Sequence, residues 1–383
     1  MACFVAGLAT GPSVRAQAPP EPAKADVLPP VSVEVVRIDV VVTDRGGHAK
    51  AGLAREDFAV LEDGKPQTLV QFGAYARRMV AKPSTPVPSP SAPAVVDEAA
   101  RPRPTRFVVL VVDDVHMELA NMLRTREALT RFLDEDTNPE DQIALVTTGS
   151  AQGVSQEFTS DRDLLRRAIS RLTARSRAAA WLGPPHLTEY QAEMIERGDT
   201  LALALAVEEL VRERPGDPAP EAEVKQAARL ILAEAVYDSE RTLEVVEGLT
   251  RGLSRLPGRK TIFLLSDGFV TGRSVHSGAG FDIRRIIDAS TRAGVVIYSL
   301  ETRGLTVPRG WSAQDRMIDP ETLSLRFMIE RQSEEATRDA MNALAADTGG
   351  FLADSSNSLQ AGLRRILEDT ETYYVLAYEP TNT

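Results

Sequence analysis

The sequence predicts a doubly wound, mostly parallel α/β sheet with a helical-hairpin insertion, preceded by a small N-terminal all-β domain. Two observations carry this prediction. From residue 106 onward, short apolar runs alternate with amphipathic segments, as expected for parallel strands joined by helices. Before residue 81, short alternating segments are separated by turn signals instead, which is typical of antiparallel strands.

We interpret residues 31–80 as the small β domain. Residues 31–43 alternate apolar and polar side chains, as in a half-buried strand. Asp63-Gly64 is a strong hairpin signal, and a return strand would follow it. A domain of about fifty residues buries little core. We therefore expect it to pack against the last strand of the chain, at residues 373–378.

Three flanking segments carry no predicted fold. Residues 1–18 resemble a secretory signal peptide, because a short apolar run precedes Ala16-Gln17-Ala18, although no Lys or Arg comes before that run. Residues 19–30 are predicted to be a disordered lead-in and residues 81–105 a Pro-rich linker. We expect an exported protein, periplasmic or extracellular.

Composition narrows the class of partner. The 383 residues carry a formal net charge of −11, whereas phosphate backbones require a basic surface. No apolar run reaches the roughly 18–20 residues of a membrane-spanning helix. The sequence therefore predicts no nucleic-acid partner and no transmembrane segment.

Residues 106–371 form the predicted main domain. Its apolar runs, read as strands, lie at 107–112, 142–148, 154–158, 261–268, 295–301 and 351–353. Helical spacing of apolar residues predicts helices near 119–135, 161–173, 282–293, 330–348 and 356–370. Residues of about 178–256 interrupt this alternation with helix alone, and we expect two long antiparallel helices there, at about 188–214 and 221–256.

Carboxylates follow two of the apolar strands. Asp113 and Asp114 come directly after the first strand, and Asp267 follows Ser266 at the end of another. Open α/β sheets bind ligands outside the carboxyl ends of their strands. If these strands are neighbours, the three aspartates converge on one edge of the sheet.

Six phrases occur in an order that resembles a known family: FVVLVVDD, PEDQIALVTTGS, LPGRKTIFLLSDGF, RAGVVIYSLETRGL, LAADTGGF and YYVLAYEP. Together they resemble the von Willebrand factor A (VWA) family, and in particular its acidobacterial-type VWFA-related proteins. The upstream LAREDFAVLEDGKPQTLVQF is similar to the small β region of those proteins. The resemblance covers about residues 31–383 and implies a Rossmann-like sheet.

The resemblance implies a protein-binding or adhesion module with a metal-ion-dependent adhesion site. Asp113 and Asp267 match the first and last aspartates of that site. Val115 and Met117 stand where the family has serines, so the site is degenerate. The family's threonine has no clear match, and Thr200 is a loose candidate.

Asp113, Asp114 and Asp267, together with waters, could hold Mg²⁺, or Mn²⁺ or Ca²⁺, since such ions prefer oxygen ligands. The alternative is that the aspartates cap the following helix or bond to loop amides. Candidate partner-contact residues along the same edge are His116, Thr147, Thr148, Ser266 and Gly268.

Two other functions compete with a metal-dependent binding site. One is a structural scaffold that binds through the helical insertion without a metal. The less favoured one is an Asp-based phosphatase, because no later strand ends in a suitably placed Lys with a Ser or Thr partner. The sequence also contains no H-E-x-x-H, Walker A or G-x-S-x-G motif. We therefore expect a protein that is not an enzyme.

Overall fold

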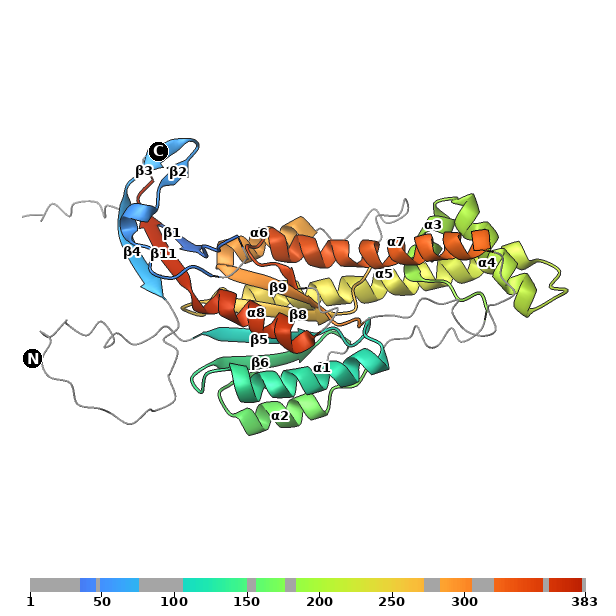
Figure 1. The fold of residues 1–383 in the computed structure, drawn as a ribbon, viewed down its shortest axis with the longest axis horizontal. Helices are drawn as coiled ribbons and strands as arrows, with labels where there is room; N and C mark the ends of the chain where they lie inside the picture. The colour runs from blue at the N-terminus through green and yellow to red at the C-terminus, as the bar shows by residue number, and fades with distance from the viewer. Residues whose placement is uncertain are drawn as a thin grey trace, which may run out of the picture.

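The computed structural model describes residues 35–45, 49–75, 106–149, 156–175, 184–271, 283–304, 320–353 and 358–380. The predicted signal peptide, lead-in and Pro-rich linker lie outside these residues. The described chain is a mixed α/β structure built on a mostly parallel six-stranded sheet (Figure 1).

The main sheet has β5 (Phe107–Val112) near its centre, in the strand order β10-β9-β8-β5-β6-β7. The other strands are β6 (Gln142–Thr147), β7 (Gln156–Thr159), β8 (Lys260–Ser266), β9 (Val295–Glu301) and β10 (Leu352–Ala353). All neighbours are parallel except β7, which is antiparallel to β6. Chain order reverses between β5 and β8, so the carboxyl ends of these two strands form the switch point of the sheet.

Helices cover both faces of the sheet. One face packs against α1 (Leu119–Arg131), α2 (Arg162–Ser170) and α8 (Leu359–Glu371). The other packs against α5 (Pro220–Leu253), α6 (Ile283–Ala293) and α7 (Pro320–Ala346). A π-helical turn, Phe132–Asp136, continues α1. Within the described residues, no helix is both long and apolar enough to cross a membrane.

A second helical unit extends beyond the sheet (Figure 1). It consists of α3 (Glu189–Glu196), α4 (Thr200–Glu213) and the amino-terminal parts of α5 and α7. We call this unit the helical projection. Its buried apolar residues form a core separate from the two sheet cores. The projection is therefore a packed body rather than a pair of loose helices.

The projection differs from the predicted hairpin in two ways. The first predicted helix is split into α3 and α4 at Gly198, which has a positive φ of 86° and so favours a helix end. The predicted start of α7 at Glu330 is wrong, because α7 begins at Pro320. Its additional turns pack Leu325 and Ile329 into the core of the projection.

The small β domain pairs the beginning of the chain with its end. Strand β11 (Tyr373–Tyr378) lies between β1 (Val36–Val40) and β4 (Leu69–Tyr75), antiparallel to both. A separate hairpin joins β2 (Val60–Glu62) and β3 (Lys65–Gln67), after a 3₁₀ turn at Arg55–Asp57. Asp63 and Gly64 at its tip have φ of 50° and 77°, the left-handed conformation that the Asp-Gly signal predicts.

Tyr374 anchors this domain. Its ring centroid lies 4.9 Å from that of Phe58 and 6.1 Å from that of Phe72. Its hydroxyl accepts a hydrogen bond from Leu53 N at 3.1 Å and donates one to Lys50 O at 2.7 Å. The last strand therefore supplies both the central pairing and the aromatic core of the domain.

We predict that Tyr374→Ala lowers the local opening free energy of β1 and β4 by about 3–5 kcal/mol, because a buried aromatic side chain is lost. Tyr374→Phe, which keeps the ring, should cost only about 1 kcal/mol. Hydrogen exchange of the amides in β1 and β4 measures this, with the amides of β5 as an internal reference. Unchanged exchange in Tyr374→Ala would contradict the anchoring role.

Candidate functional site

The carboxylate of Asp113 is the centre of the candidate site. Its side chain is fully buried, and it accepts four hydrogen bonds. Oδ1 accepts from Thr148 Oγ1 at 2.7 Å and from Thr242 Oγ1 at 3.0 Å. Oδ2 accepts from Ser266 Oγ at 2.6 Å and from His116 Nδ1 at 2.9 Å. Because a carboxylate offers about four lone-pair positions, no acceptor position of Asp113 remains open.

Asp113 and His116 form a buried ion pair. Burial alone would raise the pKa of Asp113, but the charge of His116 and the hydrogen bonds lower it below its ordinary value. Burial alone would lower the pKa of His116, but the charge and hydrogen bond of Asp113 raise it to about 9, with smaller contributions from Glu189 and Asp238. At neutral pH an imidazolium therefore neutralises the carboxylate.

Asp267 has a different set of partners. Its Oδ2 accepts from Glu118 N at 2.9 Å and from Asn121 Nδ2 at 2.7 Å, and its Oδ1 accepts from Thr302 Oγ1 at 2.6 Å. Glu118 is the residue at the amino-terminal cap of α1 and has no side-chain capping bond of its own. Asp267 thus caps α1 from the end of β8, where a carboxylate is favoured by the helix dipole. Burial raises the pKa of Asp267.

The Asp114 carboxylate contacts two loop segments. Its Oδ1 accepts from Gly149 N at 2.6 Å, and Arg175 Nε lies 3.2 Å from Oδ2. A Cβ at Gly149 would lie 2.8 Å from Asp114 Oδ1, so a larger residue there would have to displace the Asp114 carboxylate. Burial raises the pKa of Asp114. Its role is to fix the segments after β6 and α2.

The three aspartates lie at one sheet edge, but each carboxylate is bonded to a different set of residues. Among the described residues, one group of three possible metal ligands has ligand atoms that all lie within 4.8 Å of one another. This group contains none of the three aspartates. Val115 and Met117, at the family's serine positions, are buried apolar side chains. With Asp113 already neutralised and saturated, these residues do not fit a divalent ion as they stand. The ion implied by the resemblance stays a prediction.

The candidate partner-contact residues are also buried. Thr147, Thr148 and Ser266 are at most 5 % exposed, and the His116 side chain is 3 % exposed. Gly268 has a φ of 89°, and a Cβ there would lie 2.8 Å from Thr337 O. All five residues are buried beneath the carboxyl edge of the sheet, so a partner could contact them only after the structure rearranges.

The edge contains a carboxylate, an imidazole and a hydroxyl in sequence, since His116 Nε2 lies 3.5 Å from Ser239 Oγ. This order resembles that of a serine-hydrolase triad. A histidine with a pKa of about 9 is protonated at neutral pH and cannot accept a proton from a hydroxyl. Ser239 is also 2 % exposed on α5. The three side chains therefore form a buried polar contact in which His116 is already protonated.

Sequence reasoning missed three residues of this edge and misplaced one. Thr242 contacts Asp113 from α5, 129 residues away, and no local pattern marks it. Asn121 and Thr302 bind Asp267, although only helical spacing on α1 could have pointed to the former. Thr200 is wrong as the candidate threonine, because it is an exposed residue at the start of α4. Thr148 and Thr242 contact Asp113 instead.

Comparisons with known proteins find a distant structural similarity and no matching family. No protein-family model matches the chain, and no curated protein does. The chain is similar to the crystal structure of an aerotolerance-related membrane protein from Bacteroides fragilis NCTC 9343, a form with multiple mutations to serines. That match has 12% sequence identity and a TM-score of 0.31, and it covers 69% of this chain and 98% of that chain.

We predict that His116→Ala lowers the free energy of unfolding by about 3–5 kcal/mol, because it leaves Asp113 buried without its counter-charge. Thr242→Val, which removes one hydrogen bond to the same carboxylate, should cost less, about 1.5–3 kcal/mol. Leu123→Ala, at a side chain 52% exposed on α1, is the control. Urea unfolding measures all three, and a smaller loss for His116→Ala than for Thr242→Val would contradict the ion pair's leading role.

We also predict a loss of stability at alkaline pH. The pKa of His116 is raised from its ordinary value of 6.5 to about 9. Its contribution is therefore complete below pH 6.5 and is lost as the pH rises through about 9. The decrease should be on the order of 3 kcal/mol. Urea unfolding between pH 6 and 9.5 measures it, and His116→Ala should lose this part of the dependence. An NMR titration of the His116 ring with a midpoint near 6.5 would contradict the prediction.

Proposed function

We propose that the chain is an exported, non-enzymatic protein-binding module of the von Willebrand A type. In this proposal it contacts its partner through the helical projection and needs no metal at the carboxyl edge of the sheet. The observation that carries the proposal is the closed state of Asp113, whose four acceptor positions are all used by protein donors. A site that recognises a partner through a metal needs an open aspartate oxygen, and an Asp-based phosphatase needs an open nucleophile.

The helical projection has features that the edge lacks. It keeps its own apolar core, so its surface is held in place before a partner arrives, which lowers the entropic cost of binding. On α5, Leu230 and Tyr237 are 49% and 57% exposed and lie about two helical turns apart. The guanidinium carbon of Arg241 lies 5.7 Å from the ring centroid of Tyr237. Tyr and Arg are enriched among residues that dominate binding energy.

The competing location is the carboxyl edge of the sheet, which the family resemblance favours. Leu119 and Leu123 on the first turns of α1 are 65% and 52% exposed. Since Asp267 caps α1 at this edge, a partner that docks there would bury these two leucines. The two locations therefore each present a pair of exposed apolar residues, and matched substitutions can distinguish them.

We predict that Leu230→Ser/Tyr237→Ser weakens binding of a partner at least about tenfold in Kd, or about 1.4 kcal/mol. Leu119→Ser/Leu123→Ser should leave binding unchanged. The partner is first captured by the wild-type chain from the envelope of the organism that makes it, and Kd is then measured with purified components by surface plasmon resonance.

All four substituted positions are exposed, so both variants should keep the wild-type circular dichroism spectrum. Loss of binding in the α1 variant alone would overturn the proposed contact surface and favour the sheet edge. Asp113→Ala is not a suitable test, because the structure predicts that it disturbs the buried network itself.

A further inference from the structure

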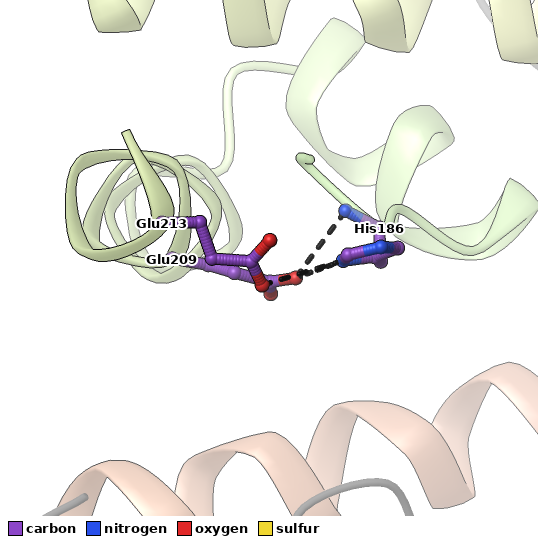
Figure 2. A group of neighbouring side chains, drawn as sticks. All are labelled: His186, Glu209 and Glu213. Atoms are coloured by element: carbon purple, nitrogen blue, oxygen red, sulfur yellow. Dashed lines mark hydrogen bonds and ion pairs between the residues drawn. The ribbon is translucent and has the colours of Figure 1, made fainter. Parts of the chain in front are cut away.

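A second group of titratable side chains lies on the helical projection, far along the chain from the aspartates of the sheet edge. Glu209 and Glu213 are one helical turn apart on α4, so they share a face of that helix. His186 comes from the segment before α3 and points toward both carboxylates (Figure 2). One possible ligand atom from each of the three lies within 4.8 Å of the other two.

Both carboxylates converge on one imidazole nitrogen. Glu209 Oε1 lies 2.7 Å from His186 Nδ1 and 3.3 Å from His186 N, whereas Glu213 Oε1 lies 3.7 Å from the same Nδ1 (Figure 2). A ring nitrogen carries at most one proton. The imidazole can therefore bond one carboxylate well and leaves the second at a distance beyond a hydrogen bond. The two carboxylates therefore share one imidazole nitrogen, and only Glu209 lies within hydrogen-bond distance of it.

A cation also lies beside Glu209. Arg326 on α7 places Nη2 3.8 Å from Glu209 Oε2. This nitrogen is buried and has no hydrogen-bond partner among the described residues. A small rotation of the Glu209 carboxylate toward a bound ion would bring Oε2 within hydrogen-bond distance of Arg326 Nη2. Arg326 is thus placed to orient a ligand from outside the coordination shell.

We propose that His186, Glu209 and Glu213 form a binding site for a divalent transition-metal ion of the Zn²⁺ class. One imidazole nitrogen and two carboxylate oxygens suit zinc and its neighbours better than Mg²⁺ or Ca²⁺, which prefer oxygen alone. Three protein ligands leave further positions for water. The ion replaces the Nδ1 proton and supplies the positive charge that the two glutamates share.

The required movements are small. Zinc takes its nitrogen and oxygen ligands at about 2.0–2.2 Å, so ligand atoms within 4.8 Å of one another need only rotations of side chains. Glu213 is the ligand with most freedom, since its side chain is 44% exposed. His186 is held by the bond from its own backbone N to Glu209. The ion would join α4 to the segment that leads into α3.

This site does not depend on the proposed function. It follows from three side chains and their contacts and would stand even if the projection bound no protein. Conversely, the exposed residues Leu230 and Tyr237 on α5 are not part of it. The two proposals therefore fail separately.

Isothermal titration calorimetry of ZnCl₂ into the full chain, purified without a histidine tag, tests the site. We expect one ion per chain, with His186→Ala and Glu213→Gln each weakening the affinity at least tenfold. Glu208→Gln is the matched control, because Glu208 also lies on α4 but pairs with Arg212. It should bind Zn²⁺ as the wild type does. Co²⁺ should give visible absorption bands that Glu213→Gln removes.

Two results would overturn the site. The first is no saturable binding of Zn²⁺ by the wild-type chain. The second is wild-type affinity in Glu213→Gln, which would place any bound zinc elsewhere on this acidic protein. Because the Glu213 side chain is 44% exposed, its substitution should leave the fold intact, so the test remains decisive even if His186→Ala is destabilised.

Discussion

The buried ion pair between Asp113 and His116 is the contact on which the rest of the sheet edge depends. A carboxylate with no solvent exposure pays a desolvation cost that only good geometry can offset. Here the cost is offset by the imidazolium of His116, three residues along the chain. Three hydroxyl groups also contribute, one each from the ends of β6 and β8 and one from α5. Neutralising one aspartate therefore also fixes four segments of chain against one another.

Local patterns were enough to predict much of this arrangement. The apolar strands and the aspartates that follow them are short-range features, and β5 and β8 are neighbours in the sheet as the edge prediction required. The Asp63-Gly64 hairpin and the pairing of the last strand with the amino-terminal strands were also expected, and both are present. In each case the structure could be predicted from a short segment, because hydrophobic periodicity, a turn sequence or a strand without a partner specifies it.

The parts that sequence reasoning missed depend on contacts between distant segments. Nothing near Thr242 distinguishes it from other threonines on a long helix, and its partner Asp113 is 129 residues away. The early start of α7 is visible only when the core of the projection is known, because Leu325 and Ile329 pack there rather than on the sheet. The charge state of His116 likewise follows from its burial beside Asp113, which the letters DDVHM do not reveal.

The long helix α5 connects the helical projection with the carboxyl edge of the sheet. It runs without interruption from Pro220 to Leu253, about 50 Å at the usual rise per residue. Its first half packs in the projection and its second half on the sheet, with Thr242 bonded to Asp113. A single rigid helix cannot tilt at one end without moving the other. The packing of α5 on the sheet and the bond from Thr242 to Asp113 therefore help to set the orientation of the helical projection.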